Sequence, residues 1–218
     1  MSDTHAVGQT RKTGGSTENE LRALIVRGAI PPGARLVESR LATDLGCSRG
    51  SVREALHALA AIDLVTLEKN RGARIRSISK KDAVQIGEVL HPLMILLGSR
   101  AAVNRTEPEA RRLRERAALV RATQLSGDAG TESEHCDAIL RSTASCARHE
   151  AARRQFCLLF DQLWRWRLES APQGVVSSGS DAYLSLVDAV AAADDAGARR
   201  AMDVIHRGLF RRAMRPAI

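Results

Sequence analysis

The sequence predicts a mainly α-helical protein with two parts: an N-terminal winged helix-turn-helix with a small β-hairpin wing, and a C-terminal all-α helical bundle. Short helical patterns and one hairpin pattern occupy residues 17–78, whereas long helical patterns without a convincing strand occupy residues 79–218. Aromatic residues make up only 3% of the 218 residues. The core must therefore be built from Leu, Ala, Val and Ile, a mixture that suits helices.

The N-terminal segment is predicted to begin with a disordered tail. Residues 1–16 are polar and rich in Gly, Ser and Thr, a composition that buries little apolar surface. Thr17 and Glu20 have the spacing of a capping box, which predicts that the first helix begins there and stops at Gly28. The two prolines that follow disfavour a helix and predict an extended turn.

Two further helices and a hairpin complete the predicted N-terminal domain. A short helix is expected over about residues 38–45, and Ser48 is expected to cap a helix over residues 49–61. The runs "LVTLE" and "ARIRSI" then read as strands joined by the turn "KNRG". Three short helices followed by a hairpin predict a winged helix-turn-helix.

The remainder of the chain predicts about six helices and no repeat. Pro108, Gly127, Gly130 and the loop "APQGVVSSGS" separate some of them. The expected helices cover residues 83–104, 107–125, 132–147, 150–170, 180–193 and 196–214.

Charge and cysteine usage limit the class of protein. The formal net charge is +8 and the sequence pI is about 10.1, which indicates an anionic partner without choosing between nucleic acid and a membrane surface. A solvated, arginine-rich surface explains the charge equally well. The four cysteines form no CxxC pair, no signal peptide is visible, and we expect no membrane span. The sequence predicts a cytoplasmic protein.

The segment "GCSRGSVREAL" places two cations at the start of a helix. On a helical wheel, Val52 and Leu56 lie on the core face, whereas Arg49 and Arg53 lie together on a neighbouring face. The helix dipole disfavours each cation there by about 0.3–1 kcal/mol. A DNA phosphate or a guanine edge would reverse that sign, and recognition helices read bases with their N-terminal residues.

The neighbouring residues fit the same interpretation. Gly50 would let the backbone approach DNA closely, and Ser48 and Ser51 could bind phosphate through their hydroxyls. Arg71 at the hairpin tip could enter a minor groove. The alternative is a solvated face in which Glu54 and Asp44 are surface partners of the two arginines.

The stretch from Leu21 to Ile75 resembles the DNA-binding domain of the GntR family of bacterial transcription regulators. The matching motifs are "G-x-I-P-P-G-x-x-L", "E-S-x-L-A-x-x-L-G", "S-R-x-x-V-R-E-A-L" and "N-R-G-A". The resemblance implies the following DNA contacts: guanine reading by Arg49 and Arg53, backbone contact by Gly50 and Ser51, and minor-groove contact by Arg71 and Gly72. A further arginine of some members falls at Ser39 here, with Arg40 one residue later.

The second half resembles the FCD subgroup of that family, which implies a dimerising domain that binds a small effector, often an organic acid. It also implies a divalent metal held by an Asp and three His. His91 occupies the position of a usual arginine. The residues in or near the ligand slots are Glu132 and Cys136, His135 after a one-residue slip, Tyr183, and His206 one residue late. Because this set departs from the pattern, we expect an effector pocket without a metal; bound Zn or Ni is left open.

The sequence therefore predicts a dimeric, effector-controlled regulator, a repressor in its simplest form, that binds a palindromic double-stranded DNA operator. Two alternatives remain. The first is a basic architectural module with no effector. The second is an enzyme acting on a small metabolite, which is disfavoured because no Ser-His-Asp order, phosphate loop, HExxH motif or paired carboxylates are visible.

Overall fold

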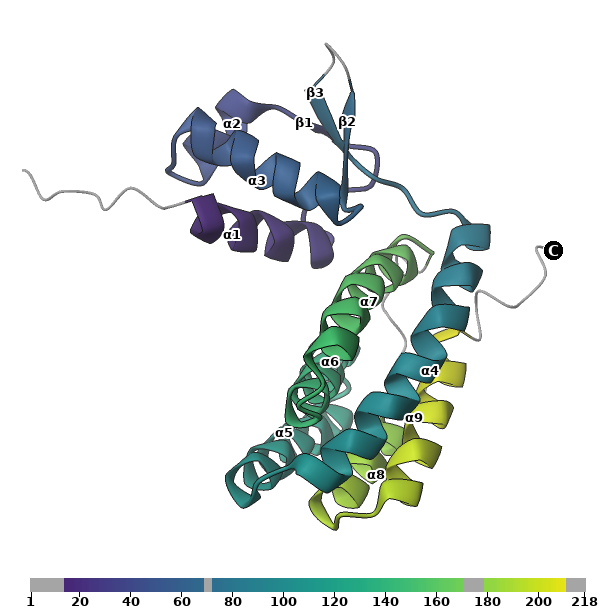
Figure 1. Ribbon diagram of the computed structural model, residues 1–218. Coiled ribbons are helices and arrows are strands. Elements are labelled where there is room, and N and C mark those ends of the chain that lie inside the picture. Colours follow the sequence, from purple (N-terminus) through teal and green to yellow (C-terminus); the bar gives the residue numbers. More distant parts are fainter. Residues whose placement is uncertain (1–13, 69–71, 171–178, 211–218) are drawn as a thin grey trace, which may run out of the picture. The chain divides into compact units, whose positions relative to one another are not determined.

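The computed structural model describes residues 14–68, 72–170 and 179–210 (Figure 1). In these ranges the chain forms nine helices and three short strands. It divides into two compact units, Met1–Ser77 and Ile78–Ile218. The division lies one residue from the border that the sequence predicts.

The first unit is built on three helices, α1 (Gly14–Val26), α2 (Glu38–Asp44) and α3 (Arg49–Ala61). Helix α1 begins three residues earlier than predicted, so the last residues of the expected tail are helical. Thr17 lies inside this helix, and its exposed fraction is 0%, as are those of Leu21 and Ile25. These residues are spaced by four, so they form one buried stripe that extends the helix beyond the predicted cap.

A three-stranded antiparallel sheet completes this unit in the order β1-β3-β2. The predicted hairpin is present as β2 (Val65–Glu68) and β3 (Gly72–Ile75), with Val65 opposite Ile75. A third strand, β1 (Arg35–Leu36), pairs with β3 and was not predicted. Two residues are too few to show an alternating pattern, so the pairing partner defines this strand.

Apolar residues from all of these elements share one core, which fixes the orientation of α3. Helices α1 and α2 and strand β2 contact α3. Gly46 has a φ of +62° in the turn before α3, a conformation that glycine adopts without cost. The buried members are Leu21, Ile25, Leu36, Leu41, Leu45, Val52, Leu56, Leu59, Leu64, Val65, Ala73 and Ile75.

The second unit is an all-α bundle, as predicted. Helix α4 begins at Lys80 because Ser79 and Asp82 form a capping box, and α6 begins at Ala129 behind the cap residue Asp128. Both starts are three residues earlier than expected. The predicted end of the last helix, residue 214, lies outside the described residues. The helices are α4 (Lys80–Asn104), α5 (Glu107–Ser126), α6 (Ala129–Cys146), α7 (Glu150–Ser170), α8 (Ser180–Ala191) and α9 (Asp195–Phe210).

Within the bundle, helix α4 contacts α6, α7, α8 and α9. In the described part of the chain it is also long and apolar enough to cross a membrane by length and composition. The sequence analysis expected no membrane span and did not note that this helix meets those two criteria. Leu90, Met94 and Leu97 are fully buried among the other helices. The core position of α4 accounts for its apolar composition.

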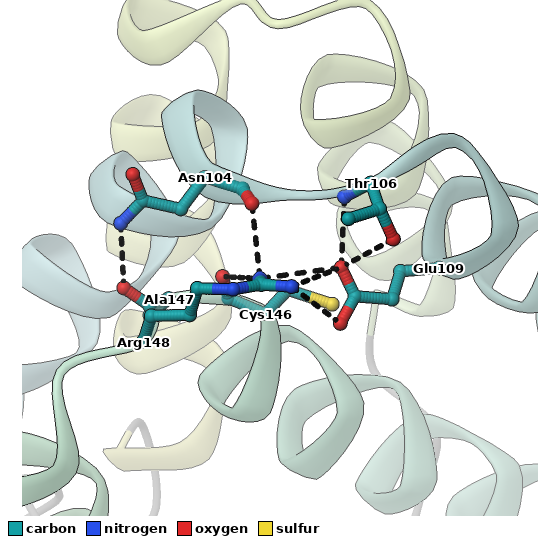
Figure 2. A network of polar contacts seen from close by, with 6 residues as sticks. All are labelled: Asn104, Thr106, Glu109, Cys146, Ala147 and Arg148. Carbon is teal, nitrogen blue, oxygen red and sulfur yellow. Dashed lines mark hydrogen bonds and ion pairs between the residues drawn. The ribbon is translucent and has the colours of Figure 1, made fainter.

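At one end of the bundle two arginines bind main-chain oxygens, and Figure 2 shows one of them, Arg148. Arg148, in the α6–α7 turn, donates to the carbonyl oxygens of Asn104 at 2.9 Å and Cys146 at 3.1 Å, and it pairs with Glu109 at 3.2 Å. Arg105 donates to the carbonyl of Val190 at the end of α8. Cations are favourable at helix C-termini, so these contacts fix how the helices meet.

Candidate nucleic-acid interface

The N-terminus of α3 is capped and exposed. The hydroxyl oxygen of Ser48 accepts a hydrogen bond from the backbone N–H of Ser51 at 3.0 Å, and the two hydroxyl oxygens are also 3.0 Å apart. Arg49 and Gly50 are exposed. Among the described residues, Arg49 has no hydrogen bond or ion pair, and its charge acts on Glu38 through space. The predicted serine, glycine and arginine positions thus form one surface at the start of this helix.

Arg53 is held by a partner that the sequence analysis missed. Its Nε and Nη2 atoms donate to the two carboxylate oxygens of Glu38 at 3.0 and 2.7 Å. The side chain of Arg53 remains 65% exposed. The hydrogen bonds from Arg53 lower the pKa of Glu38, so the carboxylate is charged at neutral pH. The guanidinium lies on the outer surface and is not turned into the core.

The predicted partners of the two arginines are not the ones that the structure shows. Asp44 lies 3.7 Å from Arg40 on the same helix, with both side chains largely exposed. Glu54 is exposed on α3. Glu38 precedes Arg53 by fifteen residues, and the crossing of α2 and α3 brings them together. No local sequence pattern signals such a pair.

Three further residues that were predicted to contact DNA, Ser39, Arg40 and Gly72, are among the described residues. Ser39 and Arg40 are exposed on α2. Gly72 begins β3 with a φ of +88°, a left-handed conformation that suits glycine in a tight hairpin. Arg71, which was predicted to contact the minor groove, lies outside the described residues.

In the helical unit, His91 and His206 lie together between α4 and α9. The two ring centroids are 4.4 Å apart. His91 Nε2 is 3.0 Å from Asp203 Oδ1, and His206 Nε2 donates to the carbonyl oxygen of Gly87 at 3.0 Å. Burial, opposed by the hydrogen bond to Gly87, lowers the pKa of His206.

Glu132, Cys136 and Tyr183 form a second group, in the interior. All three are buried, on α6 and α8. Burial raises the pKa of Cys136 to about 12, and it raises the pKa of Tyr183 as well. Arg167 on α7 opposes both shifts through space, which places its charge near both side chains. The Oε1 atom of Glu132 is buried and makes no hydrogen bond.

These two groups do not combine into a metal site. The titratable groups that act on Cys136 through space are Glu132, Arg167 and Asp137, whereas those that act on His206 are His91 and Asp203. His135 is half-buried on α6. Within the described ranges, no three His, Cys, Asp or Glu side chains are placed to hold a metal ion. The residues present therefore do not fit the Asp and three-His set that the resemblance implied.

An open groove of about 640 Å³ lies between α8 and α9. Asp181, Asp188 and Asp194 line it together with small residues and Arg200. It contains none of the predicted pocket residues, and the sequence analysis did not anticipate it.

Residues 13–75, which span α1 to β3, match the family described as bacterial regulatory proteins of the gntR family. The N-terminal domain belongs to the gntR family. This match confirms the resemblance read from the motifs, and it assigns the exposed start of α3 to the helix-turn-helix of a GntR-type regulator.

Relatives and solved structures extend the likeness into the helical unit. The chain is 26% identical over 147 residues to the HTH-type transcriptional regulator McbR of Escherichia coli (strain K12), a match covering 67% of this chain and 65% of McbR. It is 25% identical over 178 residues to a probable D-xylose utilization operon transcriptional repressor of Paenarthrobacter nicotinovorans, covering 82% and 78%. The solved structure of E. coli McbR/YncC superposes with a TM-score of 0.80 at 21% identity, over 91% of this chain and 97% of that one. The fold class, a winged helix with a helical C-terminal domain, is thereby confirmed.

Proposed function

We propose that this GntR-type transcriptional regulator binds a palindromic DNA operator as a homodimer and represses transcription until a small effector binds its helical domain. The exposed N-terminal surface of α3 is the observation that carries the proposal. It presents Arg49 and Arg53 one turn apart, beside a glycine and two hydroxyls. We propose repression because the Paenarthrobacter relative is described as a probable transcriptional repressor.

Electrostatics support a nucleic-acid partner for this surface. Arg49 lies at the positive end of the helix dipole and has no ion pair among the described residues. Such a cation is unfavourable in solvent and favourable beside phosphate or a guanine edge. Ser48 and Ser51 bind each other in the free protein, and their hydroxyls can exchange that bond for a phosphate oxygen.

The interior of the helical bundle supports the effector half of the proposal. The buried Glu132 oxygen without a hydrogen bond is the kind of group that a bound molecule satisfies. Cys136 and Tyr183 are buried as well, and the charge of Arg167 acts on both through space. A small polar molecule that carries both a carboxylate and a hydroxyl, such as a sugar acid, matches one cation and one free acceptor.

A binding measurement with charge-matched variants tests the DNA half. Fluorescence anisotropy would compare a duplex from upstream of the protein's own gene with a scrambled duplex of the same composition. We expect Arg49→Ala/Arg53→Ala to lose at least about tenfold in affinity for the specific duplex, since each guanine contact is worth about 1–3 kcal/mol. Arg111→Ala/Arg121→Ala removes the same charge from exposed positions on α5 and should bind nearly as well.

The same titration distinguishes a sequence-specific regulator from an architectural module that binds any DNA. A module without sequence preference would bind both duplexes equally, and its affinity would collapse as salt rises. Equal binding of the two duplexes by the wild type would refute the regulator proposal. Equal loss of affinity in both double variants would show that net charge, rather than the α3 surface, binds DNA.

A further inference from the structure

Glu38 engages one edge of the Arg53 guanidinium and leaves the other edge open. We propose that Glu38 is a positioning residue for base recognition, which holds Arg53 so that its open edge faces a guanine in the major groove. This inference rests on the proposed DNA-binding function. It assigns a role in specificity to a carboxylate that would otherwise only weaken attraction to DNA.

The N–H donors of Arg53 that Glu38 does not bind define the open edge of its guanidinium. Arginine carries five N–H groups in one plane, and they form two bidentate edges. Glu38 occupies the edge formed by Nε and Nη2, at 3.0 and 2.7 Å. Both hydrogens on Nη1 and one on Nη2 remain. One hydrogen from each of these two atoms points the same way, and this open parallel pair matches guanine O6 and N7.

The location of the pair makes the open edge accessible. Arg53 is 65% exposed even with Glu38 bound, and Glu38 itself is 34% exposed. Glu38 is the first residue of α2, so a short, rigid element carries the carboxylate. Arg49, one turn earlier on the same helix, has no such support among the described residues. The two arginines therefore enter a complex differently, one already oriented and the other still free to rotate.

The carboxylate of Glu38 also disfavours a contact between Arg53 and a backbone phosphate. A free arginine on a recognition helix can bind a backbone phosphate as easily as a base, and phosphate contacts carry no sequence information. Glu38 fills one of the two edges that could bind a phosphate, and its negative charge repels phosphate. Removal of Glu38 should therefore strengthen binding to arbitrary DNA while it weakens discrimination at one base pair.

The test uses the full-length protein and a matched charge control. A random double-stranded library would first yield the preferred duplex of the wild type, and Kd values would then be measured for it and for each single guanine substitution. The guanine read by Arg53 is the position at which Arg53→Ala loses its preference. Glu54→Ala removes one negative charge from an exposed site on the same recognition helix and serves as the control.

Opposite changes in affinity and specificity are the expected signature. In Glu38→Ala, the preference for that guanine should fall about five- to tenfold, while the Kd for scrambled DNA decreases. Glu54→Ala should decrease both Kd values together and keep the preference. Glu38→Ala in an Arg53→Ala background should cause no further loss of preference, since its target is absent.

Several results would overturn the inference. If Glu38→Ala keeps the full guanine preference, Glu38 does not position Arg53, although the regulator proposal survives. If the wild type selects no preferred duplex, both fail. Should Glu38→Ala fold poorly, Glu38→Gln provides a second measurement, the exchange of the Arg53 Nε–H by NMR. Exchange as slow in Glu38→Gln as in the wild type would show that the carboxylate does not hold the side chain.

Discussion

The imidazole rings of His91 and His206 lie 4.4 Å apart, where α4 and α9 pack together. His206 also contacts the ring of Phe210, with centroids 4.5 Å apart. Burial and the neighbouring His91 lower the pKa of His206, while the bond to Gly87 and the charge of Asp203 oppose the shift. The folded protein therefore favours the neutral form of His206.

Acid should destabilise the helical domain through this residue. The pKa of His206 is lower in the folded state than its ordinary value of about 6.5, so the unfolded chain binds more protons as the pH falls below that value. This contribution is fully present above pH 6.5 and is lost at lower pH. Urea unfolding at pH 7.5 and 5.5 should show a loss of up to about 1 kcal/mol that His206→Phe reduces. His135→Asn, on α6, is the control; an equal reduction there would contradict the assignment.

Gly87→Ala should destabilise the helical domain even though alanine favours helices. A Cβ atom at this position would overlap the ring of Phe210, which is 2% exposed and has little room to move. Overpacking costs about 1–3 kcal/mol, more than the 0.5–1 kcal/mol that alanine contributes to a helix. Calorimetry should show a lower Tm. Gly15→Ala in α1, where nothing lies within 4 Å, should not lower it.

Gly50→Ala should raise the stability of the free protein and lower its affinity for DNA. The nearest atom to an added Cβ is the Ser48 hydroxyl at 3.6 Å, an ordinary contact, so the free protein accommodates it. Alanine should stabilise α3 by up to about 1 kcal/mol. The methyl group would occupy the surface that we propose lies against DNA, so operator affinity should fall. A variant that is more stable and binds as tightly as the wild type would show that the backbone does not approach DNA here.

Arg148→Ala should weaken the joined end of the bundle in Figure 2. It removes the hydrogen bonds to Asn104 and Cys146 and the pair with Glu109, which should cost about 1–3 kcal/mol. The backbone of Arg148 has a φ of +51°, which glycine tolerates better than alanine. Arg148→Gly should therefore lose about 0.5–1 kcal/mol less in urea unfolding. Equal losses in the two variants would show that this conformation carries no strain.

Glu132→Met should stabilise the free protein and abolish the effector response that we propose. The substitution removes a buried carboxylate oxygen that has no hydrogen bond and replaces it with an apolar group of similar length. Thermal shift with a panel of sugars, sugar acids and small carboxylates measures both effects. Glu134→Gln, at an exposed position two residues later on α6, should keep the response. A lower Tm for Glu132→Met would mean that the carboxylate stabilises the fold.

Local sequence patterns predicted much of the secondary structure of the N-terminal domain. The bounds of α3, its cap by Ser48 and its buried face were all predicted, because capping and a 3.6-residue period depend on neighbouring residues. The start of α1 was wrong, since the buried position of Thr17 depends on packing against the rest of the domain. Strand β1 was missed because its two residues are ordered by pairing with β3.

The candidate sites show the same difference between what local sequence predicts and what tertiary packing decides. Sequence alone determined which residue types begin the recognition helix, and its motifs agree with the gntR-family match over residues 13–75. The tertiary structure decided that Glu38, fifteen residues before Arg53, binds its guanidinium. It also placed the rings of His91 and His206 beside each other, and Glu132 near Cys136, within the set of residues that the resemblance to the FCD subgroup had assigned to one pocket. The physical reason is that capping and periodicity act within a few residues, whereas ion pairs and shared pockets depend on how distant helices cross.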